Sequence, residues 1–172
     1  MRLRKTCAAV SAIALLASAA VRAAEGELFP HPPEGMLDLR FVGEGGNGEY
    51  MFVDLSTAFG ERAALTTWVL QIFNPPMENP VADIGARWTR WIYNCDTASA
   101  EPDSDAYLNT SYVLFGGVVP RPGTVTLPPQ SLGYAALDAV CNGVYIYPEG
   151  RSFVTVADAA TVVDAIVALP PP

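Results

Sequence analysis

The order of hydrophobic patterns along the chain limits the fold more strongly than any single motif. Segments with strand periodicity occupy residues 36–127, and two segments with helical spacing follow them. Parallel sheets need a crossover, usually a helix, between strands, and this part of the chain offers none. We therefore predict a single α+β domain, built as an antiparallel β-sheet with one or two C-terminal helices packed on one face.

Turn residues and prolines divide the strand region. The pair Asn47-Gly48 is typical of a hairpin turn. Proline cannot donate to a strand ladder, so Asn74-Pro75-Pro76 should end the strand before it. Four acids and a proline predict an exposed loop at Asp96–Asp105. The predicted strands are Met36–Val42, Glu49–Leu55, Arg62–Phe73, Gly85–Cys95, Tyr107–Val119 and Thr124–Leu127.

Two capping signals place the helices. Ser131 can cap a helix over Leu132–Cys141. Thr155, with Asp158 three residues later, fits a capping box that opens a helix from Val156 to Leu169. The prolines at 170–172 end this second helix.

The N-terminus has the layout of a secretory signal peptide. Arg2, Arg4 and Lys5 precede an apolar run over residues 8–21, and Ala23 suits signal peptidase. At roughly 14 residues the run is too short to cross a bilayer, so we expect no transmembrane anchor. We predict a signal peptide at 1–23, a flexible leader at 24–35, the domain at 36–169 and a tail at 170–172.

Cleavage changes the cysteines and the charge of the mature protein. Cys7 lies before the apolar run and leaves with the signal, so lipidation is not expected and the protein should be periplasmic or secreted. Four of the ten basic residues leave and all eighteen acids stay, which gives a net charge of −12 with no lysine. Such a surface repels phosphate backbones, and we expect no nucleic-acid partner.

Two cysteines remain in an oxidising compartment, and a structural disulfide between Cys95 and Cys141 is the default expectation. A zinc site needs more ligands than these cysteines and the single histidine provide, so we predict neither metal nor cofactor.

Catalytic machinery is equally sparse. His31 lies between two prolines in the leader, and no lysine base survives processing. The acids Asp96, Glu101, Asp103 and Asp105 leave a carboxylate-based hydrolase as the least favoured alternative. Their spacing does not match an EF-hand calcium loop. We expect that the protein is not an enzyme.

Several features follow one another in a fixed order along the chain. Tyr50–Asp54 leads to Ser56, a strand surrounds Trp68, and the next strand ends in Asn94-Cys95-Asp96. Then come Tyr112–Val119 and Pro129-Gln130-Ser131, which opens a helix that ends at Cys141. This layout resembles the surface-adhesin protein E family of Gram-negative bacteria. The resemblance implies a small antiparallel sheet, helices on one side, a disulfide from strand to helix, and a non-catalytic binding role in the envelope.

The function predicted from these observations is an exported, non-catalytic envelope or periplasmic domain that binds a protein or envelope component. The alternative is a periplasmic inhibitor or accessory subunit of an envelope enzyme.

Strand alternation also predicts where a partner would dock. Trp91 and Tyr93 share a face with Cys95, so a disulfide to the helix would place them in the core. Trp88, Arg90 and Ile92 would then lie on the opposite face, as a binding surface rich in hot-spot residue types. The alternative is that a C-terminal helix, or a second copy in a homodimer, covers Trp88.

Overall fold

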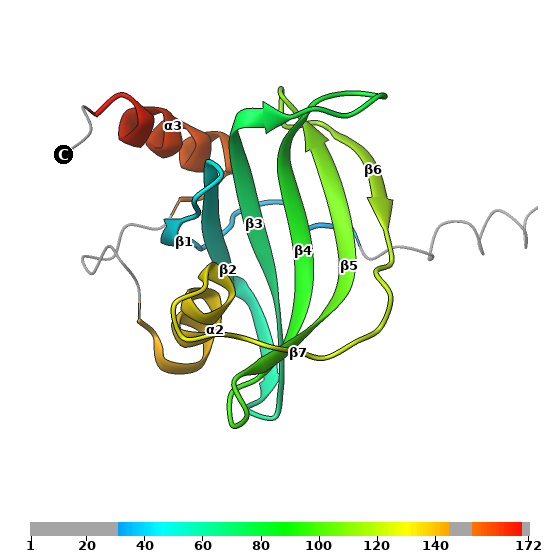
Figure 1. Ribbon diagram of the computed structural model, residues 1–172, viewed down its shortest axis with the longest axis vertical. Helices are drawn as coiled ribbons and strands as arrows, with labels where there is room; N and C mark the ends of the chain where they lie inside the picture. Colours follow the sequence, from blue (N-terminus) through cyan, green and yellow to red (C-terminus); the bar gives the residue numbers. More distant parts are fainter. Residues whose placement is uncertain (1–30, 145–152, 170–172) are drawn as a thin grey trace, which may run out of the picture. The chain divides into compact units, whose positions relative to one another are not determined.

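The structure is a computed structural model that describes residues 31–144 and 153–169 (Figure 1). The predicted signal peptide, residues 24–30 of the leader and the tail at 170–172 lie outside the described residues. The described chain forms an open antiparallel sheet followed by two helices, which confirms the predicted α+β class and single domain.

The strands follow one another across the sheet in sequence order, from β1 to β6, and the short β7 pairs with β5. Every pairing is antiparallel, and β1 to β6 are each joined directly to the next strand without a crossover helix. The strands are β1 Leu39–Glu44, β2 Glu49–Glu61, β3 Ala64–Met77, β4 Ile84–Asn94, β5 Ser99–Asn109, β6 Leu114–Val118 and β7 Val125–Thr126.

The two helices pack on opposite faces of the sheet, which corrects the prediction that the C-terminal helices share one face. In β2, Phe52 and the next residue, Val53, belong to different core clusters, as alternation in a strand requires. Helix α2 (Leu132–Asn142) packs on the Val53 side, here called the α2 face. Helix α3 (Val156–Val167) packs on the Phe52 side, the α3 face.

The part of the α3 face around Trp68 and Trp88 is apolar and buried. Trp68 and Trp88 meet edge to face with ring centroids 6.4 Å apart. Residues 31–38 cross behind β5, β4 and β3 on this side before entering β1 (Figure 1). The backbone of Leu37 donates to Val154 at 3.1 Å, so this crossing segment is joined to the start of α3.

The segment Asp96–Asp105 is not the predicted loop, because most of it belongs to β5. A register shift between Arg90 and Trp91 of β4 accommodates an extra residue in β5, where Asp103 pairs with Arg90. The Asp105 carboxylate accepts a hydrogen bond of 2.6 Å from the Thr89 hydroxyl. Asp103 and Asp105 can lie in a strand because side chains on β4 form an ion pair or a hydrogen bond with their carboxylates.

Several strand boundaries also differ from the prediction: β1 begins at Leu39 instead of Met36, and β2 runs to Glu61 instead of Leu55. Strand β3 continues past the prolines to Met77, because a register shift between Ile72 and Met77 removes them from the ladder. The predicted strand Tyr107–Val119 is divided by a turn, in which the Asn109 side chain accepts from the backbone of Val113 at 3.0 Å.

Both predicted helix caps are confirmed. The Ser131 hydroxyl accepts from the backbone N–H of Tyr134 at 3.1 Å. Thr155 accepts from the backbone N–H of Asp158 at 3.1 Å and donates to its carboxylate at 2.8 Å. The predicted helix ends are correct to within two residues.

Candidate functional site

A disulfide joins the end of β4 to α2, as predicted. The sulfurs of Cys95 and Cys141 are bonded, with 5.8 Å between the Cα atoms. Arg62 strengthens this corner, because its backbone carbonyl accepts from the Cys95 N–H at 2.8 Å and its guanidinium donates to the Cys141 carbonyl at 3.2 Å. The helix is therefore fixed to the sheet at its C-terminal end.

The structure buries one residue of the predicted docking surface, Trp88, and leaves the other two partly exposed. Tyr93 is buried on the α2 face and Trp91 packs partly buried against the same cluster, so the alternation was assigned correctly. Trp88 lies on the opposite face, yet it is only 2% exposed within the α3-face core. This corrects the expectation that Trp88 is available to a partner, because a C-terminal helix and the crossing segment close that face.

Arg90 and Ile92 keep partial exposure. The guanidinium of Arg90 is engaged by Asp103, and both side chains are 31% exposed. A binding role for Arg90 and Ile92 stays a prediction.

A groove of about 790 Å³ lies between the β1–β2 hairpin and the start of α2. Three acids contribute to its lining, Glu44 and Glu49 from the hairpin and Asp138 from the helix. The Tyr50 hydroxyl donates to Glu44 at 3.3 Å and orients it. The remaining lining residues are Val42, Gly43, Gly45, Gly46, Pro129, Gln130, Ser131, Leu132, Tyr134 and Ala135.

The hairpin turn shapes one wall of this groove. Gly48 has φ +73°, and a Cβ there would lie 2.1 Å from the Asn74 carbonyl oxygen, so only glycine fits. The predicted Asn47-Gly48 hairpin is thereby confirmed. The local sequence predicts this turn but not the helix start that it faces, since the two segments are more than 80 residues apart.

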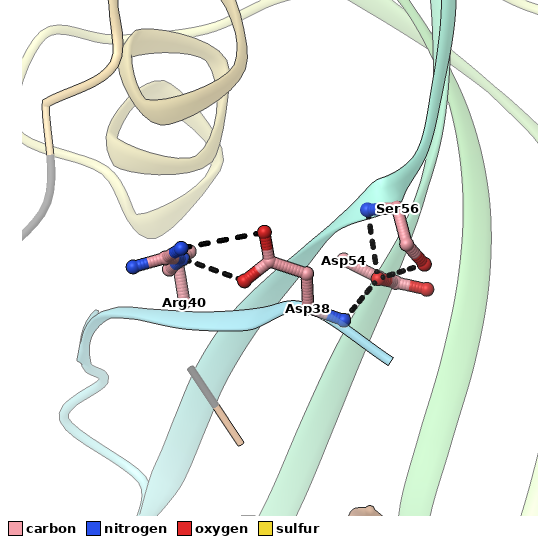
Figure 2. Close-up of polar contacts among 4 residues, drawn as sticks. All are labelled: Asp38, Arg40, Asp54 and Ser56. Atoms are coloured by element: carbon pink, nitrogen blue, oxygen red, sulfur yellow. Dashed lines mark hydrogen bonds and ion pairs between the residues drawn. The ribbon is translucent and has the colours of Figure 1, made fainter. Parts of the chain in front are cut away.

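A second polar cluster surrounds the buried Asp54 at the edge of the sheet (Figure 2). One carboxylate oxygen of Asp54 accepts from the backbone N–H groups of Asp38 at 3.0 Å and Ser56 at 3.1 Å, and from the Ser56 hydroxyl at 2.7 Å. The Asp38 carboxylate in turn accepts from Arg40 at 2.8 Å.

The geometry of Asp54 indicates a structural role. Its side chain is fully buried, and its other oxygen has no hydrogen-bond partner among the described residues. The three donors fix the entry into β1 and the bend in β2. The sequence signal was a carboxylate directly after the apolar run Tyr50–Val53, and it carries no information about the distant Asp38 N–H that donates to it.

Within residues 31–144 and 153–169, no group of three or more His, Cys, Asp or Glu side chains is placed to hold a metal ion. None of the helices described there is long and apolar enough to span a membrane.

No protein-family model matches the sequence, and neither does any curated protein. Among solved structures, the fold is similar to crystal form II of Haemophilus influenzae protein E, with 13% identity, coverage of 66% of this chain and 93% of that chain, and a TM-score of 0.47. Protein E from non-typeable Haemophilus influenzae matches at 13% identity over 80% of this chain and 93% of that chain, with a TM-score of 0.40.

Proposed function

We propose that this chain is an exported envelope or periplasmic domain that binds a protein or envelope component without catalysing a reaction. The observation that carries the proposal is the Cys95–Cys141 disulfide. Structural disulfides persist in oxidising compartments and are rare in the cytosol, where thiols are kept reduced. The bond therefore supports the export predicted from residues 1–23.

The groove beside α2 is the surface best suited to a partner. Its acids lie beside apolar side chains of Leu132 and Tyr134, and both kinds of contact suit a protein segment that carries basic residues. The mature charge of −12 would steer such a partner from a distance.

Export is tested by expressing the full chain in a Gram-negative host and recovering it from the periplasm. Intact-mass analysis should find a start at Ala24 or Glu25, and thiol labelling of the folded protein should find no free cysteine. A chain that retains Met1, carries diacylglycerol or shows two reactive thiols would overturn the proposal.

The groove is tested by crosslinking in envelope extracts from a photoreactive residue placed at the exposed Gln130. We expect a discrete product that is lost in Glu44→Gln/Glu49→Gln. The matched control is Glu61→Gln/Glu78→Gln, which removes the same charge from exposed positions outside the groove. Equal crosslinking by both double variants would show that the groove acids do not recognise the partner.

A further inference from the structure

The half of the α2 face that α2 leaves uncovered carries an organised polar patch. Strand register places Gln71, Arg87 and Tyr107 opposite one another on β3, β4 and β5, with Thr89 opposite Asp105 in the next row of this face. Helix α2 packs against β1, β2 and β3. No described element is drawn in front of the upper halves of β4 and β5 in Figure 1. We call these five residues, together with Trp91, the Arg87 patch.

Within the described part of the chain, the guanidinium of Arg87 is held by a neutral side chain and not by a carboxylate. Its Nε donates to the Gln71 amide oxygen at 2.8 Å, and its Nη2 donates to the same oxygen. Gln71 is only 7% exposed, so this contact holds the guanidinium in place. Among the described residues, no carboxylate pairs with Arg87. Three other arginines do pair with acids, Arg40 with Asp38, Arg62 with Asp96 and Arg90 with Asp103.

The partly buried guanidinium therefore keeps N–H donors for a group outside the chain. A guanidinium presents its donors in a planar fork that matches a carboxylate. A neutral amide holds the cation without cancelling its charge. This arrangement suits an anionic ligand, even though the protein as a whole is negative.

Asp105 restricts which anion fits. Its carboxylate accepts from Thr89 at 2.6 Å, which fixes its orientation. Burial raises the pKa of Tyr107, Asp105 raises it further and Arg87 lowers it, so these three side chains lie within electrostatic range of one another. A nearby carboxylate repels a simple anion, yet it accepts hydrogen bonds from hydroxyl groups. A ligand that carries both a carboxylate and hydroxyl groups satisfies both residues.

Aromatic side chains lie at both ends of the patch. Tyr107 is paired with Arg87, and Trp91 lies four positions along the same strand, about 13 Å away at the rise of a β-strand. The Trp91 ring packs on Tyr93 at a centroid distance of 6.2 Å, which orients it. Flat rings with polar edges suit the apolar C–H faces of sugar rings, whose hydroxyls need polar partners beside them.

We propose that the Arg87 patch binds an acidic saccharide, with the sugar carboxylate on Arg87, hydroxyl groups on Asp105, and ring faces against Tyr107 and Trp91. This inference goes beyond the proposed function, because it concerns a surface separate from the α2 groove and names a ligand class. It can be tested on purified folded protein whether or not the chain is exported.

The test is an NMR titration of the disulfide-bonded mature protein with methyl glucuronoside and with methyl glucoside, which differ in the carboxylate. We expect saturable shifts of the Arg87 Nε–H and Tyr107 ring signals with the glucuronoside and at least about tenfold weaker binding of the glucoside. Arg87→Gln should weaken glucuronoside binding by a similar factor. Arg121→Gln removes the same charge from an exposed position and should leave binding unchanged.

Equal binding of the two sugars, no binding of either, or undiminished binding by folded Arg87→Gln would overturn the proposal. Acetate that competes as strongly as the glucuronoside would show a simple anion site, and equal weakening by Arg121→Gln would show unspecific attraction. If Arg87→Gln does not fold, the two sugars and acetate on the unmodified protein decide the question.

Discussion

The two faces of the sheet each hold one helix, but different interactions hold it there. The α3 face buries large aromatic side chains, among them Phe52, Trp68 and Trp88, under a helix that the described chain attaches only through non-covalent contacts. On the α2 face the sheet packs smaller side chains, among them Val53 and Val69, against its helix, and a disulfide holds that helix in place.

This difference shows how covalent and hydrophobic stabilisation replace one another in a small domain. Buried apolar area stabilises by roughly 25 cal/mol per Å², so large aromatic residues can retain a helix without a covalent bond. The smaller sheet side chains of the α2 face, such as Val53 and Val69, bury less area per residue, and there the disulfide also limits the unfolded chain. Because α2 is anchored at one end and covers β1–β3, the α2 face can leave a polar surface open over β4 and β5.

The largest expected effect is on the α3 face. Trp88→Ala should lower the free energy of unfolding by about 3–5 kcal/mol, since it removes a fully packed aromatic ring. Trp91→Ala should cost less, about 1–2 kcal/mol, because its ring is only partly buried. Urea unfolding of the oxidised proteins measures both values. A larger loss in Trp91→Ala would show that the α2 face carries the main core.

The disulfide is expected to stabilise the domain by roughly 4 kcal/mol in the chain-entropy model, given the sequence separation of 46. Cys95→Ala/Cys141→Ala should therefore shift the urea midpoint strongly downward. Native-state hydrogen exchange should show that amides of α2 lose protection before those of α3. Equal loss of protection in both helices would contradict the inference that the disulfide stabilises α2 in particular, whereas apolar burial holds α3.

The Asp54 cluster is expected to have an intermediate effect. Asp54→Ala leaves the backbone donors of Asp38 and Ser56 without their acceptor, which should cost about 2–3 kcal/mol. Asp54→Asn keeps an acceptor oxygen and should cost about half as much. Chemical denaturation of the two variants provides the comparison, and equal losses would mean that charge rather than hydrogen bonding matters there.

The smallest effects are expected at the helix starts. Ser131→Ala and Thr155→Ala should each cost about 1 kcal/mol, because each removes the acceptor of a first-turn N–H. Thermal unfolding should resolve both losses. If Ser131→Ala has no effect, the disulfide alone holds α2, whereas a clear effect shows that its N-terminal end needs its own cap.

Local chemistry in the sequence determined much of the architecture. Strand periodicity followed by helical spacing determined the α+β class, and capping side chains determined where both helices begin, because these signals act within a few residues. Alternation alone placed Trp88 and Trp91 on opposite faces, and the two cysteines remaining after cleavage were enough to predict their bond.

Only the tertiary structure decided what covers each face and which polar residues meet. From the sequence, Asp103 and Asp105 suggest a solvated loop. In the structure, Asp103 pairs with Arg90 and Asp105 accepts from Thr89, and both partners on β4 lie more than ten residues earlier in the chain. From the sequence, Trp88 suggests an exposed binding residue. In the structure, α3 and residues 31–38 cover the face on which it lies. Hydrogen-bond satisfaction and burial depend on neighbours from distant segments, and local periodicity carries no information about which segments those are.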